Sequence, residues 1–164
     1  VAAPRAAPEV HLGEEAARFG SLVHRLLALP DPIDDGALEE AAAALRAEHG
    51  LGSEDAREAA ALAKATRSLP AVAAAREADL VYREQPFTCV LDGERVAGRF
   101  DLAYRKDGRW TLVDFKTARL SGPAEARARY GPQLDRYRRA LAALTSEPVD
   151  SALCLVRDGQ LVAA

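Results

Sequence analysis

The first half of the chain carries apolar residues at helical spacing among charged and alanine-rich stretches. Its first periodic segment is amphipathic, with a leucine-rich side, and Pro30 closes it. The two later segments are rich in Ala, Glu and Arg, which are strong helix formers. The pattern predicts helices over 13–29, 36–48 and 53–78.

Local signals refine these helices. Ser53 is a suitable N-cap for the third one, because its hydroxyl can accept a hydrogen bond from the first turn. Pro70 should kink or divide the same helix, since proline removes a backbone hydrogen bond. Residues 1–12 lack the periodicity and are expected to be a linker. The helical part is therefore expected to span 13–78.

The second half, from Leu80 onward, is rich in Val, Phe, Tyr and Thr and contains three Asp-Gly pairs. Asp-Gly between apolar runs is a strong signal for a tight hairpin. The pattern predicts strands over 81–91, 95–105, 109–116, 150–157 and 160–163. Pro132 suits the first turn of a helix, so a helix is expected from Pro132 to Leu144, after a shorter helical piece over 123–130. These elements indicate an α/β core over 80–164.

The hairpin that turns at Asp107-Gly108 places particular side chains opposite one another, because facing positions lie equally far from the turn. On one face Asp101 stands opposite Asp114, and Arg99 stands opposite Lys116. The other face should pack into the core through three apolar or aromatic pairs: Phe100 with Phe115, Leu102 with Val113, and Tyr104 with Thr111.

The facing acids are the informative pair. Their β-carbons would lie about 4.5–5.5 Å apart, and like charges at that distance repel unless a cation lies between them. Mg²⁺ is commonly held by one or two carboxylates and a substrate phosphate. Lys116 projects from the same face as Asp114, where an ammonium could stabilise charge on a phosphate. This set suits phosphodiester hydrolysis; the alternative is a solvated outer face that keeps an edge strand soluble.

Two further features have both a structural and a functional interpretation. Gln133 and Tyr137 share one face of the predicted helix, near Tyr130, and such a stripe is more often core than site. If that helix begins at Pro132, Gln133 lies where free N–H groups favour a phosphate. His24 lies in an apolar helical segment, where a lone histidine is usually a packed core residue.

Composition narrows the class of protein. With 164 residues, 49% hydrophobic and 29% charged, the chain fits one globular domain without a membrane span or secretory signal. Cys89 and Cys154 are too few for an iron–sulfur cluster and are expected to be buried free thiols, which fits the cytoplasm. The net charge of −3 differs from the basic surplus of proteins that grip nucleic acid unaided. The chain has no Met, which suggests a piece of a longer protein or a processed chain.

Four short motifs follow one another along the chain: Gly20-Ser-Leu-Val-His24, Gly98-Arg-Phe-Asp101, Asp114-Phe-Lys-Thr117 and Tyr130-Gly-Pro-Gln133-Leu-Asp-Arg-Tyr137. In this order they resemble the RecB-type branch of the PD-(D/E)XK nucleases. The likeness runs from residue 20 to 137 and, with the strand that follows, covers nearly the whole chain. It implies a single nuclease domain over 1–164 with a restriction-endonuclease-like core: a mixed central β-sheet flanked by helices, with an N-terminal helical segment.

The resemblance also implies roles for individual residues. Mg²⁺ or Mn²⁺ would be bound by His24, Asp101, Asp114 and the backbone carbonyl of Phe115. Lys116 would be the catalytic lysine. Gln133 and Tyr137 would help to position the scissile strand of DNA. Glu84 resembles an acidic position found upstream in this branch, but no ligand role is assigned to it.

Within the branch the chain is similar to the C-terminal nuclease domain of AddA- or RecB-like helicase–nucleases. That likeness implies a metal-dependent deoxyribonuclease, expected to be an exonuclease, in DNA double-strand break repair and recombination. A helicase motor in the same parent chain and a second subunit are the expected partners. The missing cysteine set argues against the iron–sulfur relatives. Two alternatives stay open: a catalytically silent DNA-binding or scaffolding module of a repair complex, and a free-standing member of the family.

Overall fold

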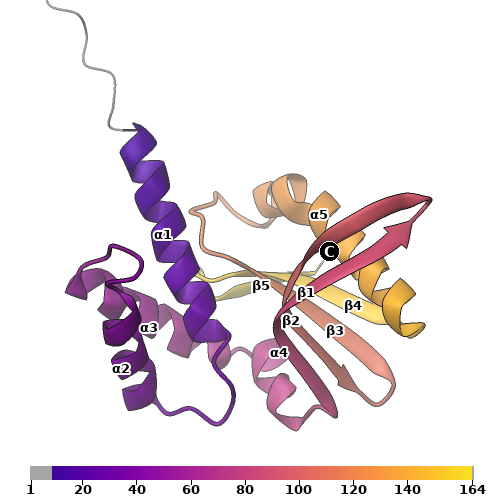
Figure 1. The fold of residues 1–164 in the computed structure, drawn as a ribbon, viewed down its shortest axis with the longest axis horizontal. Helices are drawn as coiled ribbons and strands as arrows, with labels where there is room; N and C mark the ends of the chain where they lie inside the picture. Colours follow the sequence, from indigo (N-terminus) through magenta and orange to yellow (C-terminus); the bar gives the residue numbers. More distant parts are fainter. Residues whose placement is uncertain (1–8, 164) are drawn as a thin grey trace, which may run out of the picture.

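The computed structural model describes residues 9–163, with side chains from Gly13 onward. Helices occupy the first half of these residues, and a sheet with one long helix occupies the second half (Figure 1). The helical elements of the first half are α1 (Glu9–Leu27), α2 (Asp35–Leu45), α3 (Ser53–Arg67), α4 (Pro70–Ala73) and the 3₁₀ helix η1 (Ala74–Glu77). Of the expected linker, residues 1–8 lie outside the described residues and residues 9–12 belong to α1 instead.

The helix boundaries follow local chemistry. Asp34 caps α2, since its carboxylate accepts a hydrogen bond from the Ala37 N–H at 2.8 Å. Ser53 is not the N-cap of α3, as was predicted, but its first helical residue. The cap position is Gly52, whose N–H donates to the Asp55 carboxylate at 2.9 Å. The division at Pro70 is confirmed, because α3 ends at Arg67 and Pro70 is the first residue of α4.

The sheet has five strands in the order β1-β2-β3-β4-β5. It is mixed, because β3 and β4 run parallel while the other neighbours are antiparallel, and α5 (Pro123–Thr145) connects the parallel pair. The turns at Asp92-Gly93 and Asp107-Gly108 have positive φ at both residues, as a two-residue hairpin requires. The strands are β1 (Leu80–Leu91), β2 (Glu94–Lys106), β3 (Arg109–Lys116), β4 (Val149–Leu155) and β5 (Gln160–Ala163).

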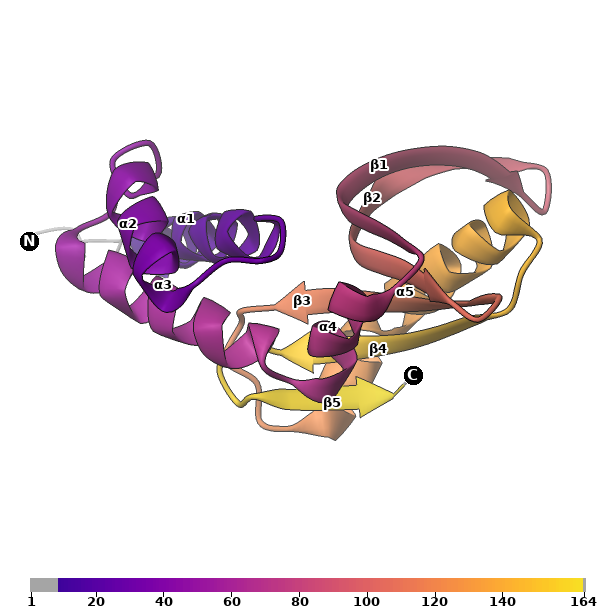
Figure 2. The ribbon, with the colours of Figure 1, turned by 90° about the horizontal axis from the view of Figure 1, so that it is seen from below.

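The sheet is covered by helices on both faces. Leu22 and Leu26 of α1 belong to a core on one face, which includes Val113 of β3. Leu134 of α5 belongs to the core on the other face, which includes Leu112 of β3. Figure 2 shows α1–α3 grouped at one end of the molecule, while β1 and β2 arch together away from β3. The expected mixed sheet flanked by helices is therefore confirmed.

The single core face predicted for the β2–β3 hairpin is wrong at Phe100. Leu102 and Tyr104 share one core face, as predicted, and this face packs toward the N-terminal helices, but Phe100 packs toward α5. Its ring stacks on Phe87 of β1, with ring centroids 4.1 Å apart. The alternation of β2 therefore changes at Asp101, where the arched part of the strand leaves β3. A rule that assumes a regular strand cannot foresee this change.

Helix α5 is one continuous helix rather than two pieces. Pro132 lies inside it, although proline in a helix interior removes one backbone hydrogen bond. Buried contacts on both sides of the proline, at Ala126 and Leu134, hold the helix to the sheet and offset that loss. As a result Gln133 lies in mid-helix, so the free N–H groups expected beside it belong to the first turn at Pro123 instead.

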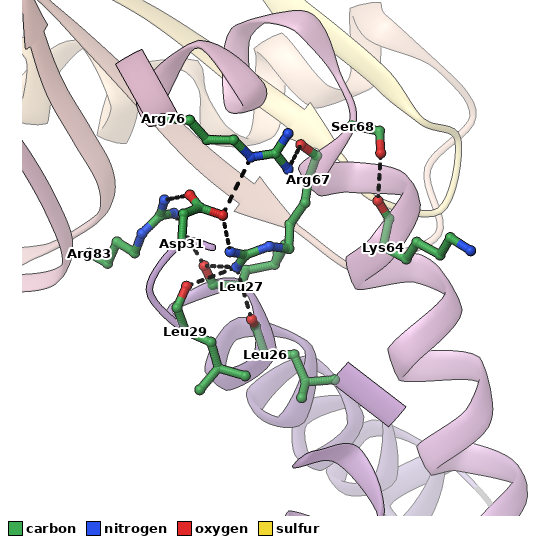
Figure 3. A network of polar contacts seen from close by, with 9 residues as sticks. All are labelled: Leu26, Leu27, Leu29, Asp31, Lys64, Arg67, Ser68, Arg76 and Arg83. Atoms are coloured by element: carbon green, nitrogen blue, oxygen red, sulfur yellow. Dashed lines mark hydrogen bonds and ion pairs between the residues drawn. The ribbon is translucent and has the colours of Figure 1, made fainter. Parts of the chain in front are cut away.

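An arginine cluster around Asp31 joins the helices to the sheet (Figure 3). Arg67 of α3 is 4% exposed and pairs with Asp31 at 2.6 Å. It also donates to three carbonyls at and just after the carboxyl end of α1. Arg83 of β1 pairs with the other Asp31 oxygen at 2.6 Å, and Arg76 lies 3.4 Å away. One carboxylate thus links α3, β1 and the loop after α1.

Both cysteines are free. Cys154 in β4 is buried, as predicted, and burial raises the pKa of its thiol to about 12. Cys89 in β1 is only partly buried, because it lies on the arched part of the sheet.

Candidate active site

All the side chains that the sequence nominates line one hollow of about 360 Å³, between the sheet, α1 and α5. Strand β3 contributes Asp114, Phe115 and Lys116, and β2 contributes Asp101. The helices add His24 from α1 and Gln133 and Tyr137 from α5. Residues as far apart in the chain as 24 and 137 therefore meet at one point of the fold.

Asp101 and Asp114 approach each other, but they are not the ladder pair that the hairpin predicted. The register of β2 and β3 is as expected from Lys106 to Leu102, where the pairing ends opposite Val113. Beyond that point β2 turns away from β3. The Asp101 carboxylate then accepts a hydrogen bond from the Phe115 N–H at 2.8 Å, so a side chain satisfies a donor that a regular ladder would have paired with backbone.

Asp114 is the acid of the pair whose negative charge the fold disfavours. It is 7% exposed, and burial together with the nearby charge of Asp101 raises the pKa of its carboxyl group above the usual range. Lys116 opposes that rise, with Nζ 2.8 Å from Oδ2 of Asp114. That oxygen is buried and receives no well-directed hydrogen bond despite the short distance. It is consequently available to a further cation.

His24 occupies the space between the acids and the backbone of β3. Its Nδ1 lies 2.9 Å from the Gly20 carbonyl, and its Nε2 lies 3.0 Å from the Phe115 carbonyl and 3.2 Å from Asp101. Carbonyl oxygens only accept, so both ring nitrogens must donate and the ring is an imidazolium. Burial disfavours this charge, but the hydrogen bond and the charge of Asp101 outweigh it and raise the pKa of His24 to about 9.

Gly20 explains why the histidine lies where it does. A β-carbon at this position would lie 2.7 Å from Oγ1 of Thr117, so only glycine lets α1 approach the end of β3 this closely. One helical turn later, Nδ1 of His24 donates to the Gly20 carbonyl, which directs Nε2 toward Asp101. The spacing of the first motif thus has a direct geometric cause.

Lys116 is held from three sides. Besides Asp114, its Nζ lies 3.4 Å from Oε1 of Gln133 and 4.5 Å from the ring centre of Tyr130. Tyr130 received no role from the sequence, where it was only one member of an aromatic stripe. Its ring lines the same hollow. Residues at the end of β3 and in α5 therefore hold the ammonium group of Lys116 in place together.

Tyr137 forms part of the wall of the hollow. Its ring packs edge-on against Phe87 and Phe100, with centroids 5.0 Å and 6.0 Å away. A β-carbon on Gly98 would collide with the Tyr137 hydroxyl, so the glycine of the second motif makes room for the tyrosine of the fourth. Tyr137 is therefore packed, as the structural interpretation of the stripe predicts, and it also lines the hollow, while its role in positioning DNA stays a prediction.

Glu84 and Arg99 also border this region, in a conformation that no pattern in the sequence indicates. Glu84 of β1 has a φ of 48°, which is costly for a residue with a side chain. Arg99 pairs with Glu84 at 2.9 Å. The negative charge of Glu84 contributes to the raised pKa of His24. Together they line a larger hollow, of about 840 Å³, that adjoins the acids and α1.

The residues present suit a divalent cation. Among the described residues no three His, Cys, Asp or Glu side chains form a ready-made ligand group. However, the buried Asp114 oxygen without a directed hydrogen bond and the Asp101 carboxylate offer hard oxygen ligands. The His24 imidazolium, beside Asp101 and the Phe115 carbonyl, holds positive charge at the place where such a cation would be expected. The donor set therefore fits the ion.

Comparison with known proteins agrees with this chemistry. No helix in the described part of the chain is both long and apolar enough to cross a bilayer. Among curated proteins no relative matches the chain. A family model described as the PD-(D/E)XK nuclease superfamily matches residues 4–163. Membership of this superfamily suggests metal-dependent nuclease activity. Because the match covers nearly every residue, the chain belongs to the PD-(D/E)XK nuclease superfamily.

Proposed function

We propose that this domain hydrolyses phosphodiester bonds of DNA with the help of Mg²⁺ or Mn²⁺. The observation that carries the proposal is the convergence of two carboxylates, one lysine and one histidine on a single hollow. Asp114 is buried among them with a raised pKa, so its charge is incompletely balanced. A divalent cation would balance it, and a nuclease of this superfamily would use one.

The cation would be held by Asp101, Asp114, the Phe115 carbonyl and the Nε2 atom of His24. When bound, it would activate a water molecule and neutralise charge on the phosphate. His24 must first lose the proton on Nε2, because only the neutral ring has a lone pair to share. The hydrogen bond from Nδ1 to the Gly20 carbonyl keeps the remaining proton on the far nitrogen.

Lys116 would supply the second positive charge of the reaction. Once a cation shares Asp114, the ammonium can turn its donors to a non-bridging oxygen of the scissile phosphate. Gln133 lies 3.4 Å from Nζ and limits where the ammonium points. Gln133 and Tyr137, as neighbours one turn apart on α5, would position the scissile strand beside it.

A narrower assignment rests on the order and spacing of the four motifs. We infer an exonuclease domain of a RecB- or AddA-like helicase–nuclease that acts in double-strand break repair and recombination in the cytoplasm. The net charge of −3 supports this setting, because a helicase motor would deliver the DNA that an acidic domain binds weakly by itself. A second subunit would complete such a machine.

The test combines cleavage with metal binding. Wild-type protein should cut labelled single-stranded or duplex DNA with Mn²⁺ or Mg²⁺ and stop when EDTA is added. Asp114→Ala and Lys116→Ala should each lower the rate by roughly a hundredfold to a thousandfold or more. Calorimetry should show Mn²⁺ binding to the wild-type protein and to Lys116→Ala, but not to Asp114→Ala.

Matched controls exist on the neighbouring elements α5 and β2. Asp135→Ala removes an exposed acid of α5, and Lys106→Ala removes an exposed lysine of β2. Both should cut at the wild-type rate. Cleavage that survives in Asp114→Ala would exclude this site as the source of activity. A wild-type protein that binds DNA but neither Mn²⁺ nor Mg²⁺ would favour the silent scaffold instead.

A further inference from the structure

A continuous groove passes through the proposed active centre. The central hollow shares His24, Arg99 and Asp101 with the larger hollow beside α1. At its other side it shares Gln133 and Tyr137 with a third hollow, of about 640 Å³, between β2 and α5. An extended chain that crosses the acids therefore has a way in and a way out along the surface.

The third hollow differs from the centre in its charge. Arg95 of β2 and Arg136 of α5 line it, together with Pro132 and small apolar residues, and no carboxylate is among its lining residues. The centre, in contrast, is lined by two acids. Gln133 and Tyr137 line both hollows and form the boundary between them. The lining of the groove consequently changes from acidic on one side of these two residues to basic on the other.

These arginines are also less neutralised than most others in the protein. Many exposed arginines lie within 3.2 Å of a carboxylate, as Arg109 does with Asp150 and Arg138 with Asp135. Arg95 makes no ion pair with any residue that the structure describes. Arg136 reaches only Glu94, at 3.9 Å. Both side chains are exposed, so their charges are free to bind an anion that enters the groove.

We propose that Arg95 and Arg136 form a phosphate-binding subsite that holds the DNA backbone next to the scissile position. The proposal rests on the proposed function and extends it to two arginines that have no assigned role: Arg136, inside the fourth motif, and Arg95, outside all four. Two carboxylates at the centre repel a polyanion, so the strand needs cations beside the centre as well as in it. Guanidinium groups suit this task because their donors match the oxygens of a phosphate.

Tyr137 separates the centre from the subsite and is closely packed. Its packing holds the backbone that carries the two arginines at a defined position relative to the centre. Tyr137 is wedged between Gly98 and the stacked rings of Phe87 and Phe100. Arg136 precedes Tyr137 on α5, and Arg95 lies on the same strand as Gly98. A phosphate on the two arginines would therefore be held relative to Lys116 by packed elements and not by a loop.

The test is the salt dependence of DNA binding by the Arg95→Ala/Arg136→Ala double variant. A short fluorescein-labelled single-stranded DNA is titrated in EDTA, where no cutting occurs, at about 50 to 200 mM salt. The double variant should bind about tenfold more weakly than wild type near 0.1 M salt. Its slope of log K against log salt should be smaller by about 1.4, or about 0.7 for each lost phosphate contact.

The control is Arg109→Ala/Arg138→Ala, which removes the same charge from β3 and α5 at positions outside the groove. Equal weakening of binding in both double variants would overturn the subsite, because net charge alone would then explain the loss. Cutting with Mn²⁺ gives a second readout: KM should rise in Arg95→Ala/Arg136→Ala while kcat stays near wild type. Unchanged KM in a wild-type enzyme that cuts would overturn the subsite alone, whereas wild-type protein that neither binds nor cuts DNA would overturn the proposed function as well.

Discussion

The carboxylate of Asp31 lies among three arginines, whereas the carboxylates of Asp101 and Asp114 share one lysine and one histidine. Both clusters are largely shielded from water. Burial alone would raise the pKa of Asp31, but Arg67 and its neighbours outweigh burial and lower it. Burial and Asp101 raise the pKa of Asp114, and Lys116 does not compensate.

The opposite directions of these two pKa shifts separate a structural cluster from the cluster that we propose to be functional. At Asp31 the folded state favours the charged form, so the cluster stabilises the fold at neutral pH. At Asp114 the folded state disfavours the charged form, so the fold accepts a cost there. Such a cost is expected where a ligand, here a cation, supplies the missing charge.

The largest effect on stability is expected from Asp31→Ala. The change leaves the buried Arg67 guanidinium without its counter-charge, so the free energy of unfolding should fall by about 3 kcal/mol. Urea denaturation measures it. Cleavage per folded molecule should stay near wild type, because Asp31 lies outside the groove. A loss below about 0.5 kcal/mol would show that the three carbonyl contacts of Arg67 suffice without the acid.

Asp114→Asn should have the opposite sign. The amide removes the repulsion from Asp101 and the cost of a buried charge, so the metal-free protein should gain about 1 kcal/mol in free energy of unfolding. Thermal denaturation in EDTA measures the gain, and Mn²⁺ should stabilise wild type but not this variant. A metal-free variant less stable than wild type would contradict the contrast with Asp31, because Asp114 would then stabilise the fold.

A pH series should separate His24 from the acids. Its pKa is raised to about 9 in the folded state from 6.5, so its stabilisation is complete below about pH 6.5 and is lost as the pH rises toward 9. The denaturation midpoint in EDTA should fall over this window in wild type and less in His24→Gln. Mn²⁺ affinity should rise over the same window, since the cation competes with the Nε2 proton. A flat midpoint in wild type would mean that His24 is neutral.

The smallest effect is expected within the arginine cluster, from Arg76→Ala. Its side chain is 48% exposed and its Nε lies 3.4 Å from Asp31, the geometry of a weak surface pair. The loss should be below about 0.5 kcal/mol. A loss as large as that of Arg67→Ala, measured by urea denaturation beside it, would mean that the cluster acts as one unit and not through its buried member.

The sequence predicted those features that short-range rules determine. Asp-Gly pairs located the hairpins, Pro70 divided the helices, and the spacing of Asp114 and Lys116 placed both side chains in one hollow. Features that depend on distant packing were missed. Pro132 stays inside α5 because buried contacts on either side outweigh the lost hydrogen bond.

The site shows the same division. Counting positions from the hairpin turn predicted that Asp101 lies opposite Asp114. In the structure the arch of β2 ends the pairing with β3 at Leu102, and the Asp101 carboxylate turns toward the Phe115 N–H. The positive φ of Glu84 and the contact of Tyr130 with Lys116 arise from tertiary packing, so no pattern of residue types announces them. The roles assigned to His24, Gln133 and Tyr137 remain predictions.

The hollow draws its lining from distant parts of the chain, with His24 on α1 and Tyr137 on α5. The set of groups is complete only while both helices stay packed against the sheet. Local unfolding of either helix, or a proteolytic cut that frees one of them, would take a group out of the hollow. The proposed chemistry thus belongs to the folded domain and to no single segment of it.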